Sequence, residues 1–136
     1  MIRIRFSCNE RAELEIEATK SEWIELNQRF HEFCGGLESV VEILADVSFD
    51  PSPYHAILSR LFVQKTAERI LVRVKDGILF LSGAERYLEM FAENIPYNAE
   101  QNSTIAYHVH FDRAGREDYV SEESLEPVID FQPRLV

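Results

Sequence analysis

The first part of the chain alternates between apolar and polar side chains. Residues 2–6 alternate isoleucine and phenylalanine with arginine, and residues 13–17 alternate glutamate with leucine and isoleucine. The polar pair Asn9-Glu10 separates the two runs. A period of two is typical of a strand with one buried face, so the pattern predicts a β-hairpin. Its solvated face would place Arg3 and Arg5 opposite glutamates, which favours cross-strand ion pairs.

A helical pattern follows. Thr19-Lys20-Ser21-Glu22 fits a capping box, in which a threonine and a glutamate three residues later each bind the other's backbone. Apolar side chains then recur every three or four residues, at Trp23, Leu26, Phe30, Phe33 and Cys34. Gly35-Gly36 ends the run. We therefore predict a helix over about 20–34.

The next segment combines a strand pattern with a helix-start signal. Residues 41–49 alternate, which predicts a strand, although Val40 and Leu44 also fit a helix. Ser52 and Pro53 resemble the cap and first residue of a helix. A short helix is therefore expected next, with an apolar side formed by Tyr54, Ile57, Leu58 and Leu61.

The strongest local signal is the Asp76-Gly77 pair between two alternating apolar runs. This dipeptide is typical of a two-residue hairpin turn. The turn pairs Lys75 with Ile78, and the resulting face is assigned to the core: Val72, Val74, Leu79 and Leu81. On the other face, the stems of Arg73 and Lys75 can cover Ile78 and Phe80.

Ser82-Gly83-Ala84-Glu85 fits a second capping box and predicts a helix over about 83–95. Pro96 would stop this helix, because proline lacks the backbone donor that continues it. A polar loop is expected at 98–103.

The last third of the chain predicts short strands. Residues 105–111 alternate, and Tyr119-Val120 can begin a further strand after the turn at 113–116. Prolines bracket the apolar run 128–131, which favours an edge strand or a terminal one. With neither repeats nor linkers, residues 1–136 are expected to form one α+β domain. It would be a mainly antiparallel sheet built from hairpins, with two main helices (about 20–34 and 83–95) packed on one face.

Charge narrows the choice of partner. The 136 residues include 24 acids and 14 Lys or Arg residues, for a net charge of −10. Nucleic acid and anionic membrane are therefore unfavourable partners, whereas a basic protein is a favourable one. No apolar stretch has the length of a membrane span, and Met1–Phe6 alternates where a signal peptide would be continuously apolar. We expect a cytoplasmic protein.

The acids gather toward the C-terminal end. Between residues 112 and 130 only Arg113 and Arg116 oppose them. The segment is rich in turns, where binding surfaces are often built. The residues predicted to bind a partner are Asp112, Glu117, Asp118, Glu122, Glu123 and Glu126.

Little in the sequence indicates catalysis. His108 and His110 would point the same way from a strand, as two metal ligands can, but further ligands would have to come from His31, His55 or an acid. Two partly solvated strand histidines are the simpler interpretation. Cys8 and Cys34 lie too far apart in sequence for a zinc knuckle. No glycine-rich phosphate loop or G-x-S-x-G motif is present. We expect no enzyme activity, no metal and no other cofactor.

Several short segments carry a family resemblance. They are Ala45–Tyr54, Leu79–Gly83, His108–His110 and Ser124–Ile129. Together they resemble immunity protein family 32 of bacterial polymorphic toxin systems over residues 40–131. That family tends to show a Pro-Tyr segment, a strand ending in Ser-Gly before a helix, a His-x-His strand and a Ser-Leu/Pro-x-Val-Ile ending. Glu126-Pro127 departs from the tighter form of that ending.

The resemblance implies a cytoplasmic antitoxin that binds and blocks a cognate toxin domain, and it names no binding residues. A basic toxin domain would suit the acidity of the chain. Two alternatives remain open: an acidic secretion-type chaperone or adaptor, and a small metalloenzyme using His108 and His110. Such chaperones usually begin with a helix and dimerise, whereas this chain begins with a strand pattern, so a monomer is favoured.

Overall fold

The computed structural model describes residues 1–95 and 107–132. Over these ranges the fold is α+β, as the sequence predicts, with two helices and nine strands. The strands divide between two mixed, mostly antiparallel sheets, where we expected one. The five-stranded sheet has the order β4-β1-β2-β9-β8, and the four-stranded sheet has the order β3-β5-β7-β6. The predicted loop at 98–103, Ile105, Pro96 and Pro133 lie outside the described residues.

The N-terminal hairpin is confirmed and forms the middle of the five-stranded sheet. The strands of this sheet are β1 (Arg3–Cys8), β2 (Ala12–Thr19), β4 (Ala56–Leu58), β8 (Tyr107–His110) and β9 (Val128–Gln132). β1 pairs antiparallel with β2, with Arg5 opposite Glu15 and Phe6 opposite Leu14. This register sends Ile4 and Ile16 into the core, where both are almost fully buried.

The expectation of an edge position for the last strand is wrong. β9 lies between β2 and β8, parallel to β2 and antiparallel to β8. Pro127 precedes the strand, so its lack of a backbone N–H costs the sheet no hydrogen bond. Its carbonyl oxygen accepts the Phe111 amide at 3.0 Å. Pro127 therefore precedes β9 without excluding neighbours on both sides of the strand.

The Asp-Gly hairpin is confirmed in the four-stranded sheet. Its strands are β3 (Val40–Leu44), β5 (Arg60–Lys65), β6 (Leu71–Lys75) and β7 (Ile78–Gly83). β6 and β7 pair in the predicted register, Lys75 with Ile78 and Val72 with Leu81. Asp76 and Gly77 both have positive φ, as a tight two-residue turn of this kind requires. Arg73 covers Phe80, with its guanidinium carbon 5.2 Å from the ring centroid.

The helix expected near residues 54–61 is absent, and strands take its place. β4 adds to β1, and β5 lies between β3 and β7. Leu61 and Val63 are buried at a spacing of two, which fits a strand in a sheet interior. The possible strand at 119–120 is reduced to a single bridge between Val120 and Ile70.

The strand expected over 41–49 ends at Leu44. Ala45 makes an isolated bridge with Ile2, and the Asp46 side chain then accepts the Ser48 amide at 2.8 Å. This local hydrogen bond turns the chain out of the sheet.

Helix α1 (Lys20–Gly35) begins with the predicted capping box. The Thr19 side chain accepts the Glu22 amide, and the Glu22 carboxylate accepts the Thr19 amide at 2.9 Å. The second predicted box is wrong: α2 (Glu85–Ala92) starts after Ala84, which has no side-chain cap. Ser82 and Gly83 instead complete β7. Neither described helix is long and apolar enough to cross a membrane.

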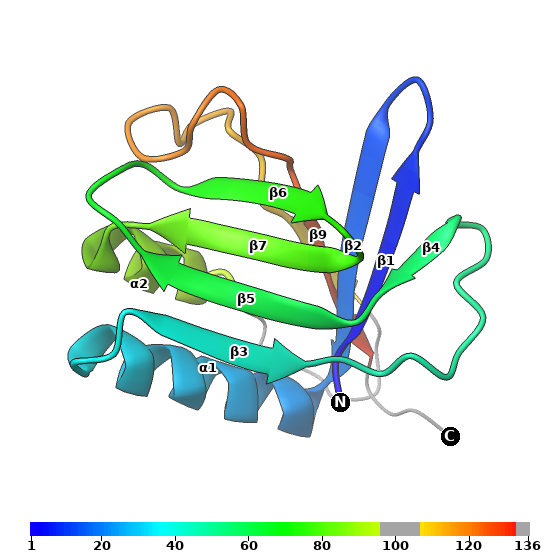
Figure 1. Ribbon diagram of the computed structural model, residues 1–136, viewed down its shortest axis with the longest axis horizontal. Coiled ribbons are helices and arrows are strands. Elements are labelled where there is room, and N and C mark those ends of the chain that lie inside the picture. The colour runs from blue at the N-terminus through cyan, green and yellow to red at the C-terminus, as the bar shows by residue number, and fades with distance from the viewer. Residues whose placement is uncertain (96–106, 133–136) are drawn as a thin grey trace.

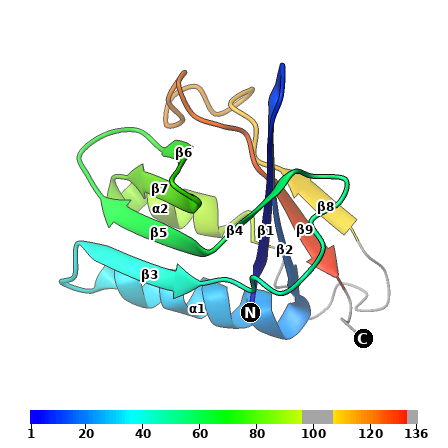
Figure 2. The same cartoon turned by 45° about the vertical axis from the view of Figure 1, so that its right-hand side comes forward.

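The core lies between the two sheets and the helices (Figure 1). In this view α1 lies below the four-stranded sheet and α2 lies behind it. β1 and β2 run steeply across one end of the sheet. Turned by 45°, the molecule shows β9 and then β8 to the right of β2 (Figure 2). Phe91 of α2 joins these parts, because its ring lies 5.8 Å from that of Phe30 and 4.8 Å from that of Phe111.

Candidate functional site

The six acids predicted to bind a partner lie on the segment that runs from β8 to β9. This segment follows the edge of β6: the Ile70 amide donates to Tyr119 O at 2.7 Å and the Leu125 amide to Val72 O at 2.9 Å. The Ser124 hydroxyl accepts the Val72 amide at 2.8 Å. The loop therefore presents its acids from a fixed backbone and is not a loose tail.

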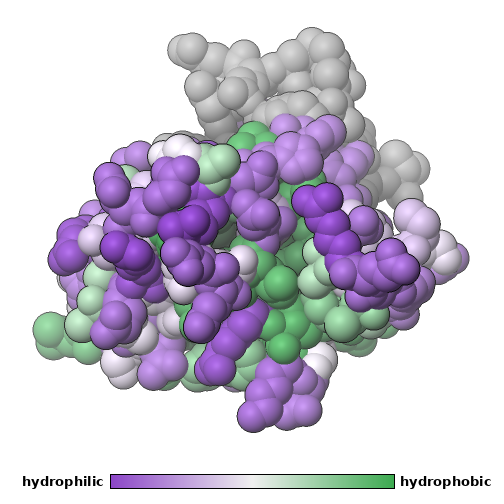
Figure 3. Space-filling view, turned by 90° about the horizontal axis from the view of Figure 1, so that it is seen from above, coloured by the Kyte–Doolittle hydropathy of each residue, from purple (hydrophilic) through white to green (hydrophobic). Residues whose placement is uncertain are grey.

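The structure separates these acids into two groups. Asp112 and Glu126 line a groove of about 690 Å³ together with Glu13, Tyr54 and His110. The other four are exposed on the loop outside this groove: Glu117, Asp118, Glu122 and Glu123. From above, the end of the molecule shows two mainly hydrophilic lobes with a strip of hydrophobic surface between them (Figure 3).

Some of these acids already have partners within the segment. Glu126 accepts the Arg113 amide at 2.7 Å, and Glu122 lies 3.7 Å from the Arg113 guanidinium. Glu117 accepts the Gly115 amide at 3.0 Å, and this hydrogen bond together with that of its own amide lowers the pKa of Glu117. These contacts order the turns of the segment.

The groove opens onto a second polar surface that sequence patterns found only in part. Side chains of paired residues point to the same side of a sheet. The β-ladders therefore place one polar face on the five-stranded sheet, formed by Arg3, Arg5, Ser7, Glu13, Glu15, Glu17, Val128, Asp130, Gln132, His108 and His110. We call this set of residues the polar face.

Arg5 is the centre of the polar face. Its guanidinium lies 2.6 Å from Glu15 and 3.1 Å from Glu17, and Arg3 lies 3.6 Å from Glu17. The predicted cross-strand ion pairs are thus confirmed. The side chains of Arg5, Glu15 and Glu17 are only 13%, 16% and 10% exposed, so the network is largely withdrawn from solvent.

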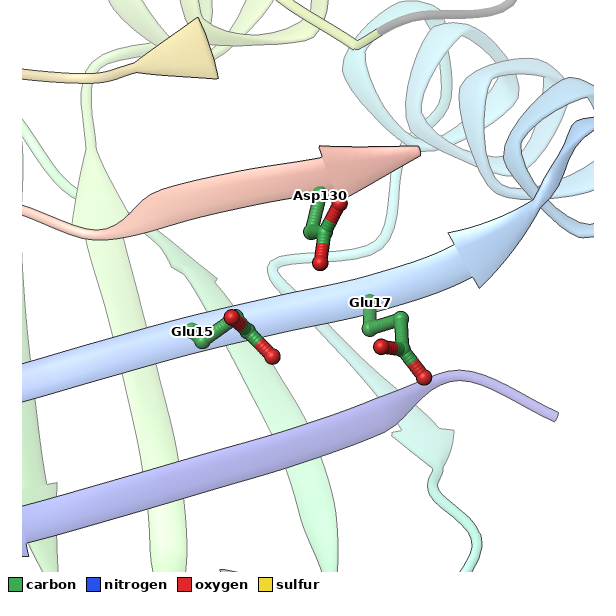
Figure 4. A group of neighbouring side chains, drawn as sticks. All are labelled: Glu15, Glu17 and Asp130. Carbon is green, nitrogen blue, oxygen red and sulfur yellow. The ribbon is translucent and has the colours of Figure 1, made fainter. Parts of the chain in front are cut away.

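Three carboxylates crowd around this network. Oxygen atoms of Glu15, Glu17 and Asp130 lie within 4.8 Å of one another, with Asp130 on the strand next to the two glutamates (Figure 4). Burial, and then the charge of Asp130, raise the pKa of Glu15. Burial is also the main cause of the raised pKa of Asp130, assisted by the charge of Glu17. The cluster therefore carries more negative charge than Arg5 and Arg3 offset.

The loop between β3 and β4 packs over this face. The Phe49 ring lies 5.2 Å from the Arg3 guanidinium carbon and 4.7 Å from that of Arg5. Burial and the charges of Glu15 and Glu13 raise the pKa of Tyr54. Tyr54 and Glu13 both line the open groove.

The two histidines lie on the polar face, as the alternation predicts. Both are exposed, and their ring centroids are 5.0 Å apart. Among the described side chains, the group that satisfies metal-ligand spacing contains the three carboxylates and no histidine. Because Arg5 already forms ion pairs with Glu15 and Glu17, these carboxylates are better suited to holding a guanidinium or ammonium group than to a bare ion.

Sequence reasoning noticed the glutamates of β2 but did not connect them to Asp130. The alternation of Glu13, Glu15 and Glu17 was the available signal. The parallel pairing of β2 with β9 is a contact between the two ends of the chain, and no local pattern indicates it.

Comparison with known protein families, with curated proteins and with solved structures finds no match for this chain.

Proposed function

We propose that this chain is a cytoplasmic immunity protein that binds and neutralises a basic cognate toxin domain of a bacterial polymorphic toxin system. It acts by association and has no catalytic role. The proposal draws on the resemblance over residues 40–131 and on the net charge of −10.

The observation that carries the proposal is the open groove on the five-stranded sheet, which presents Glu13, Asp112 and Glu126 next to Tyr54, with Arg11 also in the lining. The carboxylates Glu15 and Glu17 of the polar face are largely withdrawn from solvent and paired with Arg5. A lysine or arginine from a partner would therefore meet the groove acids, and charge-assisted hydrogen bonds of this kind are among the strongest in protein interfaces.

The decisive test is co-expression with the toxin domain encoded beside this chain. We expect the wild-type protein to restore growth and to co-purify with the toxin. The double variant Glu13→Lys/Glu126→Lys should bind about 10- to 100-fold more weakly, because it places cations where the partner presents its own. Glu68→Lys is the matched control, since this exposed acid lies in the turn between β5 and β6, away from the groove.

Two results would contradict the proposal. If the wild-type chain neither protects cells nor binds the toxin, the function is wrong. If Glu68→Lys weakens binding as much as the double variant, the acidic groove is not the binding surface.

A further inference from the structure

The two edges of the four-stranded sheet differ in how they are covered. β6 is covered by the segment that leads to β9, which satisfies backbone groups of Ile70 and Val72. β3, at the opposite edge, has no such covering segment among the described residues. Two contacts nonetheless reach this edge: the Asp46 amide donates to Ile2 O at 2.8 Å beside the bridge between Ile2 and Ala45, and the Arg29 side chain donates to Glu42 O.

The register of β3 shows which backbone groups face the open side. The Lys65 amide donates to Ser39 O and the Ala45 amide to Ser59 O, so odd-numbered residues in this stretch bond to β5 and its flanks. In an antiparallel pair the intervening residues direct their N–H and C=O groups the other way. Those residues are Val40, Glu42 and Leu44. Glu42 O meets an Arg29 guanidinium nitrogen at 3.2 Å, which confirms the direction.

The open edge also exposes apolar side chains. Leu44 is 60% exposed and Val40 40% exposed. Natural edge strands usually carry a lysine, a proline or a bulge that prevents another strand from adding. β3 has none of these, and the one charge in it, Glu42, is paired with Arg60 at 2.9 Å.

A groove lies between this edge and α1. It has two hollows of about 380 and 470 Å³ that meet at Arg29. The charged lining consists of that arginine, the Met1 ammonium group, which is paired with Glu22, and five glutamates, at positions 22, 25, 32, 38 and 42. The groove is therefore strongly acidic along its length and apolar at Leu44 and Leu37, which favours a basic occupant.

We propose that the edge of β3 receives an extended, basic segment of a protein partner as an added strand. Main-chain hydrogen bonds to Val40 and to the amides of Glu42 and Leu44 would hold the segment, and its lysines or arginines would face the glutamates of α1 and of residues 38–42. The surface shares no residue with the acidic groove of the five-stranded sheet, so the inference goes beyond the proposed function and does not depend on it.

The test uses a nine-residue peptide of alternating lysine and valine, with a glutamate-valine peptide as its charge-reversed counterpart. We expect the basic peptide alone to bind, and amide hydrogen exchange to slow at Val40, Glu42 and Leu44. Binding should weaken as salt is added, because exposed charges contribute to it.

Two matched pairs of variants locate the contact. Glu42→Pro removes a donor on the open edge, whereas Glu42→Ala keeps it, so the proline variant should bind about fivefold to tenfold more weakly than the alanine variant. Leu44→Lys should repel the basic peptide, whereas Val47→Lys changes an equally exposed apolar residue beyond the edge and should not. Circular dichroism checks that each variant is folded. If Glu42→Pro is unfolded, the comparison of Leu44→Lys with Val47→Lys decides whether the peptide binds at this edge.

Several outcomes would overturn the inference. They are no binding of the basic peptide, equal binding of the acidic one, or binding without protection of the three amides, as a docked helix would give. Concentration-dependent dimerisation that Leu44→Lys abolishes, without peptide binding, would assign the edge to a second copy. Failure of toxin neutralisation with successful peptide binding would refute the proposed function and leave this inference standing.

Discussion

At the scale of one residue, Asp130 shows that the polar face contains carboxylates that repel one another. Its main chain is structural, because Asp130 O accepts the Trp23 indole N–H at 3.1 Å. Its side chain faces Glu17, and burial raises its pKa. The same residue thus anchors α1 to the sheet and adds an unfavourable charge to the surface.

Replacing this charge should stabilise the protein at neutral pH. A carboxyl whose pKa is raised in the folded state binds more protons there than in the unfolded state, so stability rises as pH falls through this window and is lost as pH rises. Asp130→Asn should therefore raise the free energy of unfolding at pH 7 by roughly 0.5 kcal/mol, a value reduced for solvent screening. Below the unfolded-state pKa, near pH 3, the difference should vanish. Thermal melts at both pH values measure it, with the exposed Glu123→Gln as control; a destabilised Asp130→Asn at pH 7 would contradict the reasoning.

The two cysteines should differ in reactivity. Burial, and then the charge of Glu89, raise the pKa of Cys34 to about 11, whereas Cys8 is exposed at the end of β1. The thiolate is the reactive form. With iodoacetamide at pH 8, mass spectrometry should find one label on the folded protein, at Cys8, and a second after denaturation. Equal labelling of both in the folded state would show that Cys34 is accessible.

At the scale of elements, α1 and α2 are positioned by different means. α1 has a complete capping box, whereas α2 begins at an uncapped alanine and is held by packing. The Asn27 side-chain amide donates to Ala92 O at 3.2 Å and connects the end of α2 to α1. Stability contributed by the α1 cap therefore supports both helices.

Removing the α1 cap should cost measurable stability. Thr19→Ala leaves the Glu22 amide without its acceptor, and loss of such a cap costs about 1 kcal/mol. Ser21→Ala is the matched control, because Ser21 is an exposed neighbour whose hydroxyl lies 3.3 Å from that of Thr19. Urea unfolding compares the two. Equal destabilisation would show that the capping box is not the source of the effect.

At the scale of the whole molecule, the net charge of −10 bears on the proposed binding of a basic partner. Glu122 and Glu123 lie outside the groove on an exposed loop, where charges act over the Debye length and contribute little to a packed interface. We therefore expect Glu122 and Glu123 to affect the rate at which a basic partner associates more than the rate at which it dissociates.

Charge reversal on this loop should slow association. Glu122→Lys/Glu123→Lys should lower the association rate with the toxin domain several-fold at low salt and flatten its dependence on ionic strength, with a small change in dissociation rate. Stopped-flow measurements over a range of salt concentrations test this. Unchanged association kinetics would remove the loop from the encounter surface without affecting the groove.

Local patterns determined the elements whose signals are contained within a few residues. The N-terminal hairpin, α1 with its cap, and the Asp76-Gly77 hairpin were predicted, the last of these in its register, because each depends on side-chain periodicity and turn chemistry. The predicted acids at Asp112 and Glu126 do line a groove. Their use as a binding surface stays a prediction.

Only the tertiary structure decided the features that depend on contacts distant in sequence. Residues 54–61 follow an acceptable helix start, yet they form strands. β4 pairs with the edge of β1, and β5 pairs with β3 on one side and β7 on the other. Gly83 pairs with Lys65 as the last residue of β7, and a Cβ at this position would approach Ile70 Cδ1 to 2.9 Å. The carboxylate cluster exists because β9 inserts beside β2. Sequence periodicity therefore determined which face of each element is polar, and strand pairing across the chain decided which polar faces meet.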